Sequence, residues 1–329
     1  MKPAIAVITP TLNRLDLLNQ ALSSVCDQTF TNWEHIVVDD GSTDGTEQAV
    51  TARAAADPRL RYITRDRLPA GANACRNLGV AASRADLVIF LDSDDLLSPE
   101  CLDQRIRLMN GDAALDLAVF PGWVFTGAIG DRGRLFSPSV IGDDLDRFLY
   151  LDYPWEITSP IWRKRAFERL GGFDESLPSW QDVDLHVRTL IAGLRYVKAG
   201  APDHHIRWNS EPTKTSVRQF KAAGHLQSGE SLVRSFHDRL ATSGMLTLAR
   251  RQALGGLHFL LAEAWIRQGE VAQAFSVWHQ ARRTRLASVV KHGAGILVLT
   301  AFRLKLLPPD YNERLLERFK IAAGFRFQQ

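Results

Sequence analysis

The sequence predicts an α/β domain, built on a mostly parallel sheet with flanking helices, followed by an all-helical region. Three observations support this. Short apolar runs alternate with segments of helical spacing through the first hundred residues. These runs are continuous, as is typical of strands buried on both faces of a parallel sheet. From about residue 216 onward the strand signal disappears, and the chain becomes rich in Ala, Leu and Arg.

The elements of the first part follow one another in order. Residues 4–10 form an apolar run that Pro10 ends, and helical spacing over 14–28 follows with Asn13 as its expected N-cap. Further strands are predicted within 34–46, at 60–64 and at 86–92, and a helix is predicted at 70–83. In a sheet of this kind a ligand binds beyond the carboxyl ends of the strands.

The middle of the chain has a mixed pattern. Residues 116–125 have a strand signal, whereas 159–177 and 179–197 look like helices and loops that carry polar clusters. The change in composition and pattern near 212–218 marks a domain boundary. We therefore predict two domains, an α/β domain over 1–215 and a helical region over 216–329.

Composition limits the class of protein. The three cysteines are an odd number without metal-binding spacing, which indicates a reducing compartment and no disulfide framework. The start lacks a long apolar segment, and the longest apolar run near the end, 293–302, is shorter than the roughly 20 residues that span a bilayer. We expect a cytoplasmic protein. Residues 285–329 are basic, with eight Lys/Arg and three Asp/Glu.

The apolar strand at 86–92 runs into an acidic cluster, in which Asp92, Asp94 and Asp95 fall within four residues. Carboxylates this close repel one another unless a cation joins them. Two Asp at i and i+2 after a strand suit a sugar hydroxyl and a hard divalent cation, Mg²⁺ or Mn²⁺. The alternative is an acidic turn that caps the next helix, and both interpretations remain open.

Three other clusters carry candidate chemistry. Asp39 and Asp40 end a strand before a glycine turn, where they can hold a base or ribose edge or simply form an Asx turn. Arg76 lies on a predicted helix and either reaches a diphosphate or faces water. Asp182 follows Trp180 at a predicted helix start, which suits a general base or an N-cap.

Together and in this order, six segments resemble the family 2 inverting glycosyltransferases of the GT-A fold. The resemblance covers about residues 3–210, two thirds of the chain. Each motif is weak alone, but the combination is specific. The segments are VITPTLNR, VVDDGSTDGT, GANACRNLG, IFLDSDDLL, GGFDESL and WQDVDLHVR.

The resemblance implies roles for individual residues. Asp94 would be the main protein ligand of a divalent metal, Mn²⁺ or Mg²⁺, and Asp182 would be the catalytic base of a single displacement that inverts the anomeric centre. Trp180 and Gln181 would shape the acceptor side. The residues implied to bind the donor nucleotide are Thr9, Pro10, Asn13, Asp39, Arg76 and Asp92.

The remaining candidates concern the acceptor and the metal. Trp155 and Trp162 suit stacking on an acceptor sugar, or they belong to the core. Asn209 stands where many relatives carry a His that reaches the metal or diphosphate. His204 and His205 lie nearby, and strand alternation would point them to opposite faces. His205 and Asn209 are thus candidates for contact with the metal or diphosphate.

We therefore expect a hexosyltransferase-type enzyme that uses a nucleotide-diphospho-sugar, with UDP as the expected nucleotide. Its acceptor would be a saccharide or a lipid-linked saccharide in bacterial cell-surface polysaccharide assembly, with no nucleic-acid partner. A sugar nucleotidylyltransferase is an alternative, but residues 9–18 after the first strand lack its glycine-rich loop. A non-catalytic carbohydrate-binding or scaffold protein is a second alternative, which the presence of Asp94 and Asp182 disfavours.

Residues 283–320 mix apolar and cationic side chains. An interfacial helix at an anionic membrane has this composition, and it would bring the protein to a lipid-linked acceptor at the inner face of the cytoplasmic membrane. The alternative is an ordinary helical domain in which Arg and Lys extend along the surface towards water. The sequence leaves both open.

Overall fold

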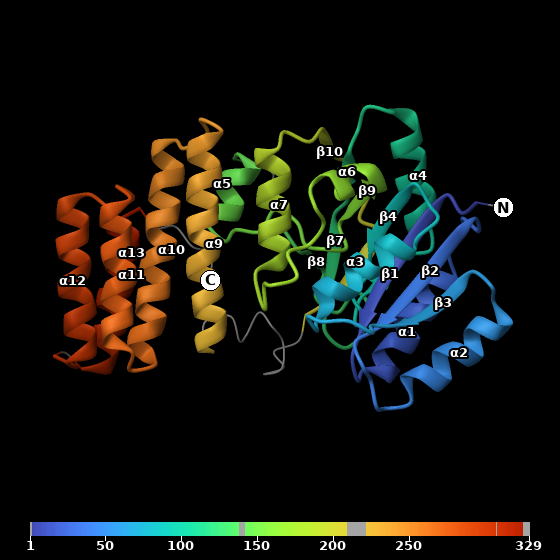
Figure 1. The fold of residues 1–329 in the computed structure, drawn as a ribbon, viewed down its shortest axis with the longest axis horizontal. Helices are drawn as coiled ribbons and strands as arrows, with labels where there is room; N and C mark the ends of the chain where they lie inside the picture. The colour runs from blue at the N-terminus through green and yellow to red at the C-terminus, as the bar shows by residue number, and fades with distance from the viewer. Residues whose placement is uncertain (1, 138–141, 209–221, 307, 325–329) are drawn as a thin grey trace. The chain divides into compact units, whose positions relative to one another are not determined.

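The computed structural model describes residues 2–137, 142–208, 222–306 and 308–324. Contacts within the chain divide it into two units (Figure 1). The first, the sheet unit, holds the described residues up to 137 together with 155–176 and 192–208. The second, the helical unit, holds 142–154, 177–191 and the described residues from 222 onward. Two segments from the middle of the chain therefore pack with the C-terminal helices, a division that differs from a single boundary after 215.

The sheet unit is built on a seven-stranded sheet in the order β10-β6-β9-β4-β1-β2-β3. Only β9 runs antiparallel to its neighbours, β4 and β6, and the other pairs are parallel. The predicted α/β class with a parallel-dominated sheet is confirmed. The strands are β1 (Ile5–Thr11), β2 (Trp33–Asp39), β3 (Leu60–Thr64), β4 (Leu87–Phe90), β6 (Leu117–Val119), β9 (Pro160–Arg163) and β10 (Tyr196–Lys198).

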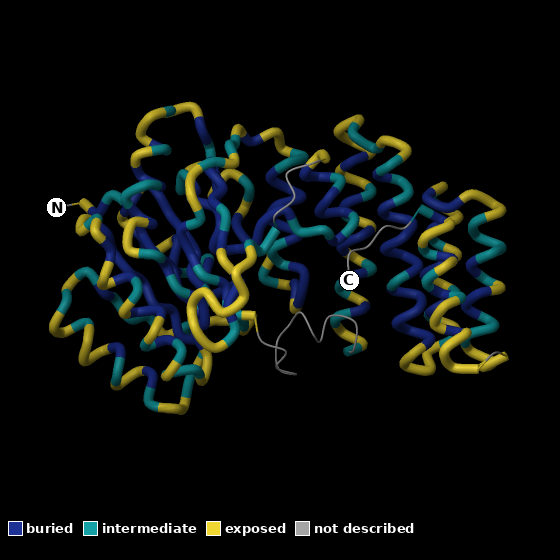
Figure 2. The backbone as a smooth tube through the Cα atoms, turned by 180° about the vertical axis from the view of Figure 1, so that it is seen from behind, coloured by how far each residue is buried: buried dark blue, intermediate teal, exposed yellow. Residues whose placement is uncertain are grey.

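Helices cover both faces of this sheet, which explains the continuous apolar runs. Every residue of β1 and β2 is buried (Figure 2). Val7 belongs to a core cluster with residues of α1 (Leu15–Cys26) and α4 (Cys101–Gly111). Ile8 faces α3 (Ala72–Ala82), where Gly79 permits close packing, because a Cβ there would lie 2.4 Å from Ile8 Cγ2. A further helix, α2 (Thr46–Ala56), packs on β3.

A second sheet of four short strands has the order β5-β11-β7-β8. Its β11 pairs antiparallel with β5 and parallel with β7. Because β5 directly follows the acidic cluster at 92–95, the pairing of β11 with β5 places β11 next to that cluster. The strands are β5 (Leu96–Leu97), β7 (Gly122–Phe125), β8 (Arg134–Leu135) and β11 (His204–Arg207).

Two local expectations were wrong. The first turn of α1 is not capped by Asn13, which has a φ of 50° and accepts the N–H of Thr43 instead. Asp44 from the next loop accepts the N–H of Leu15 at 2.9 Å and so takes over the cap. The segment expected as helix and loop begins with the strand β9 and continues as α6 (Lys164–Arg169). A four-residue strand buried between two others is too short to show a period.

The helical unit consists of packed helices, as the sequence predicts beyond residue 216. Within it, α7 packs on α5 and α9, and α10 packs on α5, α9, α11 and α12. Throughout the described ranges, no helix combines the length and the apolar character needed to cross a membrane. The helices are α5 (Asp144–Leu149), α7 (Gln181–Ile191), α9 (Ala223–Thr242), α10 (Leu248–Arg267), α11 (Val271–Arg283), α12 (Val289–Arg303) and α13 (Pro309–Ala322).

Candidate functional site

The polar clusters of the sheet unit meet where β4, β1 and β2 end. These three strands are parallel neighbours, so their carboxyl ends share one edge of the sheet. Backbone hydrogen bonds between neighbouring segments continue beyond the strand ends. The N–H of Asp40 donates to the carbonyl of Thr11 at 2.9 Å, and the N–H of Leu91 donates to the carbonyl of Ile8 at 3.0 Å. Among the implied donor residues, Thr9 is fully buried and shares a 2.9 Å hydrogen bond with His35 Nε2, and Pro10 is buried beside it.

The carboxylate of Asp39 is 1% exposed and is engaged within the protein. Its Oδ1 accepts the backbone N–H groups of Gly41 and Ser42 and the Ser42 hydroxyl, at 2.7 to 3.1 Å. Its Oδ2 accepts the Tyr62 hydroxyl at 2.7 Å. Burial, together with that bond, raises the pKa of Tyr62 to about 12. Asp39 therefore fixes the 39–42 turn, and little of its acceptor capacity remains for a nucleobase.

The neighbouring Asp40 links three elements, a role that sequence reasoning missed. Its Oδ1 accepts a hydrogen bond from Arg65 Nε, beyond the end of β3. The same oxygen accepts Gly71 N–H at 3.1 Å, at the start of α3. Gly71 has a φ of 124°, a backbone conformation that favours glycine. The two adjacent aspartates at 39 and 40 were visible in the sequence, but the different partners that each of them binds depend on the fold.

Arg76 and Asp92 come together as the sequence suggested. The guanidinium of Arg76 is almost fully buried, and its Nη2 donates to Asp92 Oδ1 at 2.5 Å. It also lies over the Phe173 ring, 5.2 Å from the centroid. Within the described part of the chain, its Nε and Nη1 have no hydrogen-bond partner. Buried cationic donors without a partner are costly, so this group is suited to an anion that the protein does not itself supply.

The acidic cluster after β4 is more buried than a solvated turn would be. Ser93, Asp94 and Asp95 are each about 5% exposed. Asp94 Oδ2 lies 3.4 Å from Arg14 Nη1, an ion pair from the loop before α1. Burial, and then the repulsion of nearby carboxylates with Asp94 foremost, raises the pKa of Asp95 well above its ordinary value. Arg14 partly offsets the negative charge, and the cluster remains suited to a further cation.

The strand β11 holds this cluster through Arg207. The backbone N–H of Arg207 donates to Asp95 Oδ1 at 2.8 Å, and its Nε donates to the carbonyl of Asp94 at 2.9 Å. Its guanidinium also lies 4.4 Å from the centroid of the Phe125 ring. Side chain and backbone of one residue thus fix the loop that carries the carboxylates.

A buried ionic network lies behind β11, and sequence reasoning did not anticipate it. His204 is completely buried between Asp203 and Glu156, with both nitrogen–oxygen distances 2.8 Å. Arg105 pairs with Asp203 through two hydrogen bonds of 2.7 and 2.8 Å. Burial alone would lower the pKa of His204, yet the bonds to Asp203 and Glu156 raise it. Burial alone would raise the pKa of Asp203, yet Arg105 holds it well below its usual range.

The two histidines of β11 point to opposite faces, as strand alternation predicts. His205 is half-buried and shares a 3.1 Å hydrogen bond with Ser98 Oγ through Nε2. Burial lowers its pKa, so it is neutral near pH 7. Its contact with a metal or diphosphate stays a prediction. Asn209, the other candidate for that role, lies outside the described residues.

A metal ion would have to be held jointly with substrate. In the described residues, no group of three or more His, Cys, Asp or Glu is arranged to hold a metal by itself. The donors present are carboxylate oxygens, with Asp94 and Asp92 two residues apart. Mg²⁺ is typically bound through one or two carboxylates plus substrate phosphates, and Mn²⁺ also suits oxygen ligands. The residues therefore fit an ion that binds together with a diphosphate.

The implied base, Asp182, belongs to the helical unit and lies in the first turn of α7. Its Oδ1 accepts the N–H of Val183 at 2.9 Å. Trp180, just before the helix, is buried and has a φ of 62°, an uncommon value for a tryptophan. Gln181 is half-buried at the helix start. The roles of these three residues stay predictions.

Two tryptophans assigned to the acceptor side belong to the core instead. Trp162 is fully buried in β9 and contacts the Phe167 ring, and Trp155 is buried against Tyr196. A buried ring offers no face to a saccharide. Trp123 on β7 and Trp208 after β11 are the exposed tryptophans of the small sheet, so they are better candidates.

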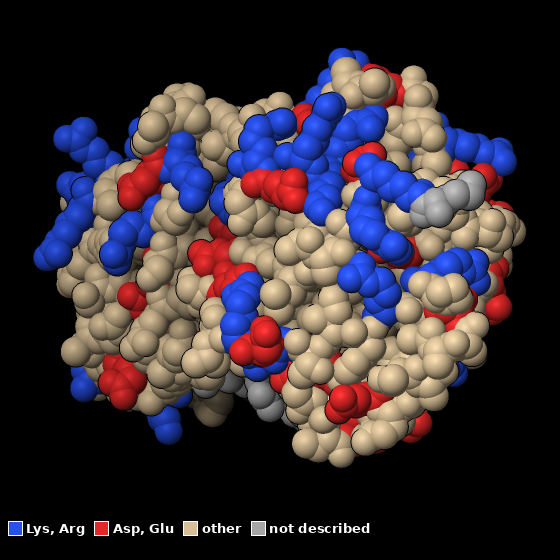
Figure 3. Space-filling model, turned by 45° about the vertical axis from the view of Figure 1, so that its right-hand side comes forward, with Lys and Arg blue, Asp and Glu red and all other residues tan. Residues whose placement is uncertain are grey.

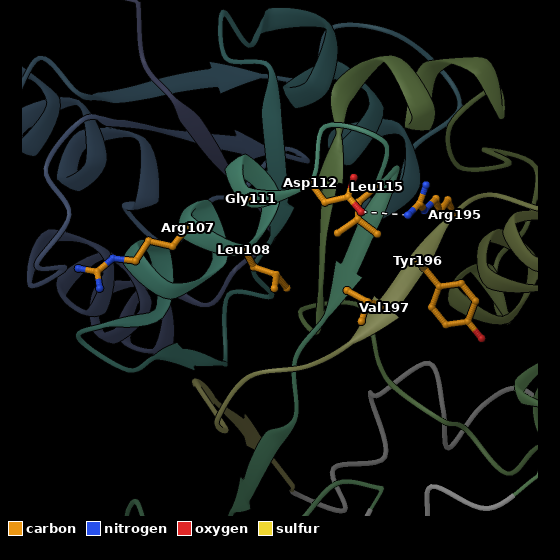
Figure 4. Close-up of a pocket in the computed structure, with 8 residues that line it drawn as sticks. All are labelled: Arg107, Leu108, Gly111, Asp112, Leu115, Arg195, Tyr196 and Val197. Atoms are coloured by element: carbon orange, nitrogen blue, oxygen red, sulfur yellow. Dashed lines mark hydrogen bonds and ion pairs between the residues drawn. The ribbon is translucent and has the colours of Figure 1, made fainter.

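A pocket of about 590 Å³ lies elsewhere in the sheet unit (Figure 4). It is lined by the end of α4 and the start of β10, and the Asp112–Arg195 ion pair of 3.1 Å lies within it. The start of a parallel strand lies at the edge opposite to the one that binds ligands. This pocket is therefore separate from the Asp92–Asp94 cluster.

Comparison with known proteins agrees with the motifs. The chain matches the family described as glycosyl transferase family 2 over residues 6–168, about half of its length. A putative teichuronic acid biosynthesis glycosyltransferase of Bacillus subtilis is 35% identical over 33% of this chain and 42% of its own length. GalNAc(5)-diNAcBac-PP-undecaprenol beta-1,3-glucosyltransferase of Campylobacter jejuni is 35% identical over 33% of this chain and 35% of its own length. Validoxylamine A glucosyltransferase of Streptomyces hygroscopicus is 25% identical over 96% and 83%.

The fold also matches solved structures. Residues 1–349 of S. aureus TarS, in complex with UDP-GlcNAc, align over all of this chain and 93% of that chain, with a TM-score of 0.66 and 18% identity. The mannosyltransferase PcManGT of Pyrobaculum calidifontis, in complex with GDP-Man and Mn²⁺, aligns over 98% and 86%, with a TM-score of 0.52 and 18% identity. At such identities the likeness concerns the fold, which is of the GT-A type. The family match and the ordered motifs together place this chain in glycosyl transferase family 2.

Proposed function

We propose that the chain transfers a sugar from a nucleotide-diphospho-sugar to a hydroxyl of a saccharide or lipid-linked acceptor in bacterial cell-surface glycan assembly. The observation that carries this is the buried guanidinium of Arg76, which donates to Asp92 at the carboxyl edge of the sheet. Two of its nitrogens, Nε and Nη1, have no hydrogen-bond partner among the described residues. A diphosphate supplies the anion that such a group requires. The relatives in teichuronic acid and undecaprenol-linked glycan synthesis support the class of acceptor.

Each group of the sheet unit has a role in this reaction. Arg76 binds the diphosphate, and Asp92 orients that guanidinium and contacts the ribose or the sugar. Asp94 would hold Mg²⁺ or Mn²⁺, an ion that offsets negative charge on a leaving diphosphate. Arg207 keeps the loop of Asp94 in place through its bond to the Asp94 carbonyl. Uridine is the base that we expect.

The chemical step is a single displacement. Asp182 takes the proton of the acceptor hydroxyl, and that oxygen attacks C1 of the donor sugar as the bond from C1 to the diphosphate oxygen breaks. Attack opposite the leaving group inverts the anomeric configuration. Trp123 and Trp208 are exposed aromatic faces on which an acceptor sugar stacks.

Donor binding is the first experiment. We expect UDP to bind more tightly than GDP, ADP or CDP in calorimetry, and Mn²⁺ to strengthen binding at least about ten-fold. Asp94→Ala removes the effect of Mn²⁺, and Arg76→Met weakens diphosphate binding with or without the metal. Asp86→Ala is the matched control, since Asp86 is exposed and pairs with Lys2 at the start of β4, at the edge opposite to the carboxyl ends of the strands. If no nucleoside diphosphate binds, the transferase function is wrong.

Turnover then tests the base. Asp182→Asn is expected to lower kcat by at least about 100-fold while donor affinity changes by less than about two-fold. Asp238→Asn, an exposed carboxylate of α9, serves as the control. Proton NMR of the first product reports the anomeric configuration, and retention would rule out the single displacement. Donor binding without any turnover on a panel of acceptors would instead favour a non-catalytic carbohydrate-binding protein.

A further inference from the structure

The outward side of α12 carries exposed apolar side chains along its whole length. Val290, Leu297 and the C-capping Leu304 are 81%, 71% and 54% exposed. They are seven residues apart, close to two helical turns, so they share one side. Gly293, Ala294 and Ala301 lie between them on that side, and none of these residues is charged. Patches of this kind mark contact surfaces more often than isolated apolar residues do.

The other side of α12 is packed within the helical unit. Gly295, Val298 and Leu299 are its buried residues, and a Cβ at Gly295 would come within 2.6 Å of the Trp278 indole. The helix contacts α10, α11 and α13. Figures 1 and 2 both show it at the edge of this group of helices. Its orientation is therefore fixed, and the stripe that faces away is not part of the core.

The charged residues in the chain segment that contains α12 are all cationic. Residues 282–306 contain six Lys/Arg and no Asp/Glu. Five of these cations are exposed, and in the described part of the chain none of the five takes part in an ion pair with a carboxylate. Elsewhere in the same unit Arg267 pairs with Glu263 and Glu313, at 2.7 Å each. The five are Arg282, Arg283, Arg285, Arg303 and Lys305.

A simpler explanation covers part of this pattern. Arg282 and Arg283 lie in the last turn of α11, and Arg303 lies in the last turn of α12. Cations at these positions stabilise helices through the helix dipole. That effect explains neither the complete lack of acidic residues over 282–306 nor the exposed stripe between the two cationic ends.

We propose that the α12 face, defined as Val290, Leu297 and Leu304 with the five exposed cations, docks on an anionic lipid surface. Apolar side chains of such a helix enter the boundary between headgroups and acyl chains, while Lys and Arg at its ends meet lipid phosphates. The purpose of the contact rests on the proposed function, because it brings the enzyme to a lipid-linked acceptor. The contact itself is a property of the helical unit.

A second copy of the chain is the competing occupant of the α12 face. A two-fold contact centred on Leu297 would bring the cations at one end of α12 in one copy towards those at the opposite end in the other, with no carboxylate in the segment to offset them. An anionic bilayer offers both an apolar layer and the opposite charge. Charge complementarity therefore favours lipid.

Vesicle flotation of the full chain tests the proposal. We expect it to float with vesicles of phosphatidylcholine containing about a third phosphatidylglycerol, and several-fold less with phosphatidylcholine alone. Leu297→Gln should lower the partition coefficient about ten-fold. Arg303→Glu with Lys305→Glu should lower it at least ten-fold, and only on the anionic vesicles. Leu248→Gln on α10, which is 73% exposed, and Arg239→Glu on α9 are the matched controls, expected within about two-fold of the wild type.

The outcomes separate the possibilities. Failure of the wild type to float, or flotation that Leu297→Gln leaves unchanged, overturns the lipid proposal. A vesicle-free dimer that Leu297→Gln dissociates, seen by sedimentation velocity, assigns the face to a second copy and likewise overturns it. Nucleoside diphosphate binding is measured on the same samples without vesicles. Binding without flotation refutes only the lipid contact, and flotation without binding refutes only the transferase function.

Discussion

Charged side chains have opposite environments in the sheet unit and around α12. In the sheet unit, Arg105 and Asp203 are both essentially buried, and each is satisfied by the other. Around α12, the exposed cations stand without carboxylates in their own segment. Figure 3 shows one face of the molecule, on which exposed Lys and Arg side chains lie among Asp and Glu side chains, an arrangement between these two extremes.

The difference indicates what each set of charges is for. A buried ion must lose its water, so it is retained only where partners hold it in fixed geometry, and breaking the pair leaves an uncompensated charge. The loop of the acidic cluster is also held in fixed geometry, by the hydrogen bonds that Arg207 donates to Asp95 Oδ1 and to the carbonyl of Asp94. An exposed cation costs little and contributes little to folding, so its effect depends on what approaches from outside.

The largest expected effect is on the buried pair. Arg105→Met leaves Asp203 charged and buried, and we expect it to lower the free energy of unfolding by about 3–5 kcal/mol. Urea denaturation followed by fluorescence measures this. The matched variant Arg303→Met should change stability by no more than about 0.5 kcal/mol. Similar losses in the two variants would end the distinction between the regions.

A steric change at the same network should have the next largest effect. A Cβ at Gly122 would lie 2.4 Å from His204 Nε2, so Gly122→Ala must displace the histidine. We expect a loss of about 1–3 kcal/mol in thermal or urea unfolding. Gly111→Ala is the control, because no atom of the described residues lies within 4 Å of the position its Cβ would take. An unchanged stability in Gly122→Ala would mean that the network adjusts freely.

Buried histidines should make stability depend on pH. Burial lowers the pKa of His35 to about 3 from 6.5, so below pH 6.5 the unfolded state takes up a proton that the folded state does not. Relative to His35→Gln, the wild type should lose about 1.4 kcal/mol per pH unit as pH falls. The stability gap between the two proteins would narrow by about 2 kcal/mol from pH 7 to pH 5.

The helical unit offers the matched case for this titration. Burial lowers the pKa of His258 to about 4. The difference in stability between the wild type and His258→Gln should therefore have the same sign as for His35 and should also narrow below pH 6.5. Denaturation at each pH unit between 5 and 7 measures both. A gap that stays constant with pH in either protein would show that the histidine is not held neutral there.

The smallest effect is expected at the α12 face. Leu297→Gln removes no contact of the core and should change the free energy of unfolding by less than about 0.5 kcal/mol. Arg303→Glu with Lys305→Glu also removes no contact of the core, but it should cost up to about 1 kcal/mol because it places negative charge at the C-terminal end of α12. A melting curve beside that of the wild type is sufficient. A loss above about 1 kcal/mol would mean that these side chains support the fold and are not reserved for a partner.

Parts of the site followed from local pattern. The parallel strands could be predicted because burial on both faces requires continuous apolar runs, and their ends then place Asp39 and Asp92 at one edge. Arg76 lies near the same edge because α3 begins where β3 ends, and Arg76 is close to the start of that helix. Trp155 and Trp162 were misassigned because an aromatic residue carries no sign of which face it will bury.

The sequence by itself determined the α/β class, the carboxyl-edge position of the acidic clusters, the family resemblance and the helical character beyond residue 216. These depend on periodicity, turn residues and motif order, which are local properties. Only the tertiary structure decided that Asp40 ties β2 to β3 and α3, and that His204, Asp203, Glu156 and Arg105 form one buried network. It also decided which side of α12 faces outward. Such pairings join residues up to about a hundred positions apart, and no local pattern carries the distance between them.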